Sequence, residues 1–174
     1  MDLLWAGWRM AYIKKAGAKG ARGEACLFCE KGRLRPGPGS LILAKTPRVL
    51  VMLNLYPYNL GHVMVATRRH EGALSRLTAE ESADLMRWLG RVERALKRAY
   101  RAQGFNIGLN LGRIAGAGVV GHLHWHLVPR WRGDTNFMPM TAGTKVLPET
   151  LARTYARVAK ALDGLDRRPR SHRR

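Results

Sequence analysis

The chain has 174 residues, of which 46% are hydrophobic and 25% are charged, a composition typical of a single folded globular domain. No apolar run approaches the roughly 20 residues that a membrane-spanning helix needs, which argues against the membrane class and a membrane partner. The N-terminus lacks the charged start and apolar run of a signal peptide, so we expect a cytoplasmic protein.

Basic residues exceed acidic residues by a wide margin. Thirty-one Lys and Arg stand against 12 Asp and Glu, which gives a formal net charge of +19. Such an excess favours polyanionic partners, whether nucleotides, nucleic acids or acidic surfaces. Many of the charges gather in residues 14–35 and in the C-terminal DRRPRSHRR, which also fits solvated ends that aid solubility. The charge alone leaves a nucleic-acid partner possible but not favoured.

The first part of the chain is predicted to form an arm, a loop and three strands. Residues 1–25 are interpreted as an N-terminal arm with aromatic anchors, and the Gly- and Pro-rich residues 32–40 as a loop. The stretch 41–58 predicts two β-rich runs divided by a Thr-Pro turn, and 59–67 predicts a third strand.

A long helix is predicted next. Thr78 and Glu81 match the capping-box pattern, and apolar residues recur at helical spacing from Leu85 to Tyr100. Because glycine suits the left-handed cap of a helix, we expect this helix to end near Gln103 and Gly104.

The remaining elements complete an α+β chain. We expect a strand in FNIGLNLG, a glycine-rich loop, a histidine-bearing strand that stops at Pro129, and a helix over residues 147–163. Runs joined by hairpin-like turns predict a mostly antiparallel sheet. The domain is expected to span residues 26–165, with a basic, disordered tail at 166–174.

The stretch GHLHWHLVPRW carries three of the six histidines at every second position: His122, His124 and His126. Alternation with a period of two is typical of a β-strand, so the three imidazoles should share one face, with Leu, Trp and Leu on the other. The histidines could be satisfied core residues, metal ligands, or a nucleophile with a metal ligand and a proton donor beside it.

The two cysteines, Cys26 and Cys29, form a CxxC pair. Such a pair can be a redox couple, half of a metal site or two incidental thiols. Its place between two Gly- and Lys-rich stretches favours half of a metal site, for which histidine is the natural further donor.

The glycine-rich loop precedes the histidine strand directly. Gly112, Gly116, Gly118 and Gly121 allow backbone amides to approach an anion closely and to form a nest for phosphate. Phosphate beside a neutral imidazole, a good nucleophile at neutral pH, points to phosphoryl or nucleotidyl transfer.

The strand His122-Leu-His124-Trp-His126 resembles the motif of the histidine triad (HIT) superfamily of nucleotidyl hydrolases and transferases. LNLYPYNLGHVMV, NIGLNLG and HLVPRWRGDTNFMP are similar to the branch that contains diadenosine tetraphosphate phosphorylases and hydrolases. The resemblance runs from about Cys26 to Asn136 and implies a HIT-like fold: a mostly antiparallel sheet of about five strands, one long helix and a C-terminal helix.

The resemblance also implies roles for the histidines. His124 would attack the α-phosphorus and form a covalent nucleotidyl-histidine, and His126 would assist the leaving group. His122 would hold a metal. In zinc-bearing members a CxxC and a further histidine complete the site, which implies a Cys2His2 structural zinc on Cys26, Cys29, His70 and His122.

Further positions would bind an adenine nucleotide substrate. The resemblance implies that Asn54 contacts the ribose, His62 lines the base pocket and Asn110 contacts the α-phosphate. The amides of Gly116, Ala117 and Gly118 would hold the phosphate chain, and Trp131 would stack on a base. For Trp131 a role as a hydrophobic plug is an equal alternative. Many members carry Gln or Ser at the position of Gly118, so the sequence leaves open whether phosphate or water accepts the nucleotide.

The implied function is cleavage of dinucleoside polyphosphates of the diadenosine tetraphosphate type. The alternatives are a nucleotide-binding or sensing protein with slow phosphoramidate hydrolase-type activity, and a hydrolase of adenylated DNA ends. The resemblance also implies a homodimer formed across the long helix and a neighbouring strand. The apolar stripe of that helix fits this interface, although burial in the monomer core would explain it equally well.

Overall fold

The computed structural model describes residues 26–134 and 147–166. The predicted arm at 1–25 and nearly all of the predicted tail lie outside these ranges, so the division of the chain into arm, domain and tail stays a prediction. Among the helices of the described ranges, none has the length and apolar character needed to cross a membrane.

Five strands form one antiparallel sheet in the order β1-β2-β3-β5-β4. The strands are β1 (Ile42–Lys45), β2 (Val49–Leu53), β3 (Val63–Thr67), β4 (Gly104–Gly108) and β5 (His124–Arg130). In the pairing of β3 with β5, Met64 lies opposite His126 and Ala66 lies opposite His124. The prediction of an α+β fold with a mostly antiparallel sheet is confirmed.

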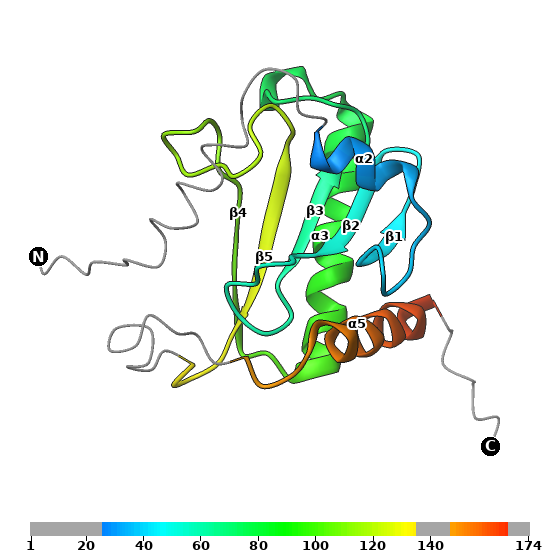
Figure 1. Cartoon of the computed structure of the whole chain (residues 1–174), viewed down its shortest axis with the longest axis vertical. Coiled ribbons are helices and arrows are strands. Elements are labelled where there is room, and N and C mark those ends of the chain that lie inside the picture. Colours follow the sequence, from blue (N-terminus) through cyan, green and yellow to red (C-terminus); the bar gives the residue numbers. More distant parts are fainter. Residues whose placement is uncertain (1–25, 135–146, 167–174) are drawn as a thin grey trace, which may run out of the picture.

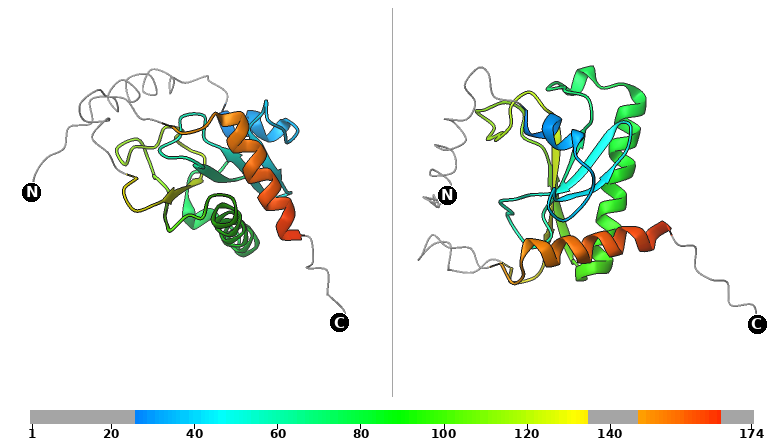
Figure 2. Two further views of the ribbon diagram at one scale, coloured as in Figure 1. Left: turned by 90° about the horizontal axis from the view of Figure 1, so that it is seen from below. Right: turned by 45° about the vertical axis from the view of Figure 1, so that its right-hand side comes forward.

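The helices lie on both sides of the sheet (Figures 1 and 2). They are α2 (Leu27–Arg33), the 3-10 turn η1 (Leu74–Arg76), α3 (Ala79–Tyr100) and α5 (Leu151–Asp166). The long helix α3 runs along one face and α5 crosses close to its end, whereas α2 lies against the opposite face. One face of the sheet is therefore closed by α3 and α5, and the other is only partly covered.

The alternation of side chains along β5 divides the core in two. Leu123, Trp125 and Leu127 belong to a large apolar cluster between the sheet and the helices α3 and α5. His124 and His126 point the other way, toward a smaller cluster built around Phe28 of α2. The predicted division of the histidine stretch into an apolar face and an imidazole face is confirmed.

Four predicted boundaries were wrong. Strand β4 ends at Gly108, before the LNLG of the predicted strand, and helix α5 spans Leu151–Asp166 where 147–163 was predicted. The other two have a clear physical cause. Helix α3 starts with the expected capping box at Thr78, but it ends at Tyr100, because Arg101 itself adopts the left-handed conformation (φ 51°) and Gly104 begins β4. Strand β5 continues through Pro129 to Arg130. The proline is tolerated because the pairing of β5 with β3 ends at Leu127. Proline has no backbone N–H, but no hydrogen bond between these two strands is lost at position 129.

Candidate functional site

The hydrogen bonds of His124 fix where its lone pair lies. Its Nδ1 is 2.8 Å from the carbonyl oxygen of His122. A carbonyl can only accept a hydrogen bond, so Nδ1 carries the proton and Nε2 carries the lone pair. The residue is 5% exposed, and burial lowers the pKa of its imidazole below the usual 6.5. His124 thus has a neutral ring whose Nε2 is available as a nucleophile.

His126 holds the opposite tautomer, through a chain of hydrogen bonds that passes through His62. The backbone amide of Tyr58 donates to Nδ1 of His62 over 3.0 Å, so the proton of His62 sits on Nε2. This Nε2 lies 2.9 Å from Nδ1 of His126 and donates to it. The proton of His126 is therefore on Nε2, where the imidazole can donate to an oxygen of a phosphate or of a leaving group.

The same burial makes His126 hard to protonate. Burial, with a smaller contribution from His124, lowers the pKa of His126 to about 4. A second proton would sit on Nδ1 and would remove the acceptor for His62. Both histidines are therefore neutral at pH 7.

This neutrality predicts an unusual pH dependence. For a reaction that needs both neutral rings, we expect kcat/KM to fall less between pH 7 and pH 5.5 than an ordinary histidine would impose, because burial lowers the pKa of both rings, that of His126 to about 4. A histidine with a pKa of 6.5 would lose roughly eightfold over the same interval. Initial rates measured alongside circular dichroism, which checks that the protein stays folded, decide between the two. An acid limb centred near pH 6.5 would contradict the prediction.

Four side chains from three segments form a compact cluster that could hold a metal ion. Their ligand atoms all lie within 4.8 Å of one another: Cys26, Cys29, His70 and His122. Sγ of Cys26 is 3.3 Å from Nδ1 of His122, and Sγ of Cys29 is 3.3 Å from Nδ1 of His70. Neighbouring ligands around tetrahedral zinc lie roughly 3.3 to 3.8 Å apart, so these distances suit one ion.

The second nitrogen of His122 orients its ring. Nε2 donates to the carbonyl oxygen of Thr67 over 2.8 Å, so Nδ1 carries the lone pair and faces the two thiols. A backbone carbonyl on the distal nitrogen is the arrangement that commonly fixes a metal-bound histidine. The donor set and its surroundings therefore fit a bound metal, and the predicted set of four ligands is brought together.

An ion-pair network holds the turn that presents His70. The guanidinium of Arg69 contacts both oxygens of Glu81 at 3.0 and 2.9 Å and one oxygen of Glu71 at 2.9 Å. The bond from Arg69 is the largest factor that lowers the pKa of Glu81 to about 2. The backbone amide of Ala73, with Arg69, likewise holds the pKa of Glu71 below its usual range. His70 is thus flanked by two residues with fixed partners.

Two glycines let this turn cross the start of the histidine segment. A Cβ on Gly72 would lie 2.8 Å from the Cα of Gly121, a separation that real Cβ atoms do not show. Gly121 itself has a φ of +83°, which a residue with a side chain rarely adopts. The two backbones touch at this point, so the spacing between His70 and His122 depends on both glycines.

We therefore expect Gly72→Ala to push the two segments apart. The clash is with backbone atoms, which cannot move aside cheaply, so the free energy of unfolding should fall by about 1 to 3 kcal/mol. Metal affinity should fall with it, because His70 shifts relative to His122. Gly39→Ala is the matched control, since nothing lies within 4 Å of its added Cβ. Equal stability and metal affinity in the two variants would contradict the expectation.

The helix α2 carries Cys29, has Cys26 as its N-cap, and is fixed at its C-terminal end by two cations. Nζ of Lys45 donates to the carbonyl oxygens of Gly32 and Leu34 at 3.3 and 2.7 Å, and a guanidinium nitrogen of Arg68 donates to that of Gly32 at 2.9 Å. Positive groups at a helix C-terminus are favourable because they meet its exposed carbonyls and its dipole. These contacts hold α2, and so Cys29, against the sheet.

The predicted nucleotide-binding residues are only partly gathered around the histidines. Asn54 lies 3.3 Å from Nδ1 of His62 and accepts from the amide of Tyr56, and His62 is 1% exposed behind His126. Asn110 donates to the carbonyl oxygen of Gly116 over 3.3 Å. These contacts place Asn54 beside the histidines, and the roles assigned to these residues stay predictions.

Two of the loop amides and Trp131 serve other contacts in this conformation. The amides of Gly116 and Ala117 donate to the carbonyls of Arg113 and Gly112, and so stabilise the loop itself. The indole of Trp131 donates to the carbonyl oxygen of Tyr100 and lies edge-on to its ring, beyond the far end of β5. Of the two roles predicted for Trp131, this contact supports the packing role.

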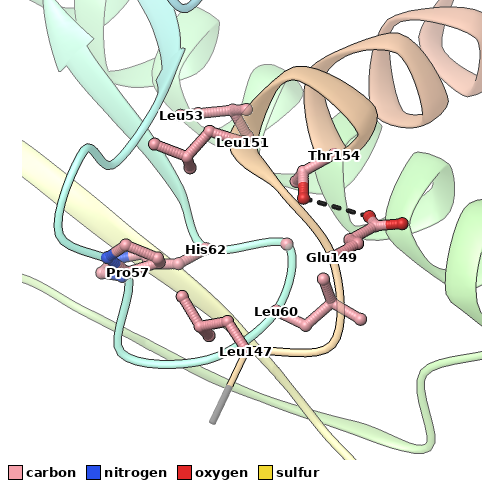
Figure 3. A pocket seen from close by; sticks show the side chains of 9 residues that line it. Leu53, Pro57, Leu60, His62, Leu147, Glu149, Leu151 and Thr154 are labelled. Carbon is pink, nitrogen blue, oxygen red and sulfur yellow. Dashed lines mark hydrogen bonds between the residues drawn. The ribbon is translucent and has the colours of Figure 1, made fainter. Parts of the chain in front are cut away.

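A small apolar cavity lies behind His62, between the β2–β3 connection and the start of α5 (Figure 3). Apolar side chains surround it, and Thr154 donates to Glu149 on one wall. His124 and His126 do not line it.

Four residues that orient the site were not predicted from the sequence. They are Phe28, Tyr58, Thr67 and Glu71. Tyr58 and Thr67 act through backbone groups, Phe28 acts through ring contacts, and the carboxylate of Glu71 accepts from the amide of Gly72. Backbone contacts leave no trace in residue type, so Tyr58 and Thr67 offered no signal. Phe28 did offer one, since it lies between the two cysteines of the CxxC pair.

Comparison with known proteins gives consistent matches. The HIT domain family matches residues 38–133. The AP-4-A phosphorylase of Mycobacterium tuberculosis (strain CDC 1551 / Oshkosh) is 43% identical over 158 residues, which are 88% of this chain and 80% of that protein. A Zn-bound histidine triad family protein from Mycobacterium smegmatis is 25% identical with a TM-score of 0.64, and the match covers 82% of this chain and 96% of that one.

A second solved structure is equally similar in fold. The hypothetical histidine triad nucleotide-binding protein ST2152 from Sulfolobus tokodaii strain7 has a TM-score of 0.66 at 25% identity, with 84% of this chain and 98% of that chain covered. Sequence and fold therefore point to the same family.

Proposed function

The chain belongs to the HIT domain family, and from that premise we propose that it cleaves dinucleoside polyphosphates by transferring a nucleotidyl group through His124. The observation that carries the proposal is the pair of opposite tautomers, a lone pair on Nε2 of His124 and a proton on Nε2 of His126. A nucleophile and a proton donor two residues apart on one strand face are what displacement at phosphorus requires.

The reaction proceeds in two displacements. Nε2 of His124 attacks the α-phosphorus, and the bond from phosphorus to the bridging oxygen breaks. The leaving polyphosphate keeps that electron pair and receives a hydrogen bond from Nε2 of His126. An acceptor oxygen then attacks the same phosphorus and returns the electron pair to Nε2 of His124. The carbonyl of His122 keeps the ring oriented throughout, since its partner nitrogen never reacts.

We propose inorganic phosphate as the acceptor. The support is the 43% identity to a protein named AP-4-A phosphorylase, which extends over most of both chains. The exposed, side-chain-free position Gly118 in the loop before the triad is compatible with an incoming anion. Diadenosine tetraphosphate incubated with phosphate should then yield ATP and ADP in equal amounts. ATP and AMP, with no dependence on phosphate, would show that water is the acceptor and would reject this part of the proposal.

We propose zinc as the ion of the Cys26, Cys29, His70 and His122 cluster, with a structural role. Two thiolates and two neutral imidazoles form a closed tetrahedral set, which zinc prefers. The ion would join α2 and its N-cap to the turn of residue 70 and to the segment just before β5. No step of the reaction passes through it.

We also propose a homodimer that uses the outer edge of β4. This strand pairs only with β5 in the described sheet and ends it on one side, and its Ile107 is 48% exposed. An unpaired strand edge with exposed apolar residues favours pairing with a second copy. Sedimentation of the wild type against Ile107→Lys tests this, and a monomeric wild type would reject it. The cytoplasmic location stays a prediction.

A further inference from the structure

The ring of Phe28 touches the ring of the proposed nucleophile, His124. The phenyl ring lies 4.7 Å from the ring of His124, centroid to centroid, with 34° between the planes. It also lies 5.1 Å from the ring of His122. Phe28 is 2% exposed, and its neighbours in the smaller apolar cluster include Leu50, Met52 and Met64. The contact is therefore a buried, partly stacked pair of aromatic rings.

The proposed reaction places a positive charge on the ring that Phe28 contacts. When Nε2 of His124 forms its bond to phosphorus, Nδ1 keeps its proton because the carbonyl of His122 accepts from it. The ring has given an electron pair and lost no proton, so it becomes a substituted imidazolium. The charge disappears only when the acceptor oxygen displaces Nε2 and the electron pair returns.

Among the described residues, few groups near His124 can stabilise that charge. The residue is 5% exposed, so water has limited access to the ring. The neighbouring rings of His122 and His126 are imidazoles, and burial lowers the pKa of each, so neither supplies a negative charge. Of the described contacts, the carbonyl of His122 accepts from Nδ1 and the aromatic ring of Phe28 lies 4.7 Å from the imidazole, centroid to centroid. An aromatic face within about 6 Å of a cation attracts it through the ring quadrupole.

We propose that Phe28 is a catalytic residue that stabilises the positive charge developing on His124 during nucleotidyl transfer, an inference that rests on the proposed function. The neutral ring of the resting enzyme gains little from the quadrupole, whereas the imidazolium gains much more. The contact is stronger in the transition state than in the ground state, which is the condition for lowering the barrier.

The fold keeps Phe28 from moving away as the charge forms. Cys26 and Cys29 flank it in sequence and join the metal-binding cluster, while Lys45 and Arg68 hold the C-terminal end of α2. A ring that is fixed beforehand costs no reorganisation during the reaction.

The test replaces Phe28 with mono-, di- and pentafluorinated phenylalanine, which preserve the shape of the ring while weakening and then reversing its quadrupole. The rate constant for formation of the nucleotidyl-enzyme is measured in single turnovers with diadenosine tetraphosphate. It should fall stepwise with fluorine content, by about 5- to 30-fold in total, with KM unchanged. Phe105 carries the same series as a control, because it packs against the other core cluster, on the α3 side.

Zinc content and melting temperature are recorded for every variant, so that a packing effect can be recognised. A rate that does not change across the Phe28 series overturns the proposal, and so does a decline that parallels zinc loss or that the Phe105 series reproduces. A wild type that forms no nucleotidyl-enzyme overturns the proposed function together with this inference. An active wild type with a flat Phe28 series overturns the role of Phe28 alone.

Discussion

Replacing His124 with Ala is expected to abolish turnover of diadenosine tetraphosphate while leaving nucleotide binding within about threefold of wild type. Removal of a nucleophile that acts as one unit with its neighbours costs roughly 10⁴-fold or more in kcat. Binding should survive because the other groups assigned to the nucleotide, such as Asn54, are untouched, and a small side chain at position 124 leaves room for the phosphate. Single-turnover kinetics and calorimetric titration with a non-hydrolysable analogue measure the two quantities.

His172→Ala serves as the control for this variant, because it removes a histidine to which no role in the site is assigned. It should behave as wild type in both assays. Turnover by His124→Ala above a small fraction of the wild-type rate would refute the covalent mechanism. Loss of binding together with turnover would instead assign His124 to substrate affinity.

Removing one cysteine of the metal cluster is expected to cost more stability than any other single change considered. Cys29→Ser should lose most of its zinc, because a hydroxyl is a poor replacement for a thiolate in a Cys2His2 site. A ligand present at a thousandfold excess over its Kd stabilises the folded state by about 4 kcal/mol, and the variant forfeits a term of this order. The melting temperature should therefore drop by several degrees, as elemental analysis and thermal unfolding will record.

A chelator provides the internal control for this experiment. It should lower the melting temperature of the wild type toward that of Cys29→Ser, and it should leave the variant unchanged because little metal remains to be removed. A wild-type preparation that contains no metal and is fully stable would reject the zinc assignment.

The features that could be predicted from the sequence are those that depend on side-chain chemistry and on the spacing of residues. The period of two around His124 predicted a strand with an imidazole face, and the CxxC with its two unknown partners predicted half of a metal site. The identity of those partners came from family resemblance, because His70 and His122 are 52 positions apart in the chain and no local pattern joins them.

What the sequence could not supply depends on the backbone. The left-handed conformation of Arg101 ended α3 at Tyr100, four residues before the glycine that predicted the end. The shorter pairing of β5 with β3 allowed Pro129 into a strand. The tautomers of His124 and His126 are set by one carbonyl and one amide. Backbone groups of this kind occur at nearly every residue type, so the sequence does not indicate which side chains they contact. Only the folded structure shows these contacts.

The opposite tautomers of His124 and His126 also give the resting site a magnetic signature. In NMR spectra of protein labelled with nitrogen-15 at histidine, protonated and unprotonated ring nitrogens have widely separated chemical shifts. The proton of His124 lies on Nδ1 and that of His126 on Nε2. The nitrogen with the protonated chemical shift should therefore be Nδ1 in one ring and Nε2 in the other. The integrity of the site can thus be read from a spectrum before any substrate is added.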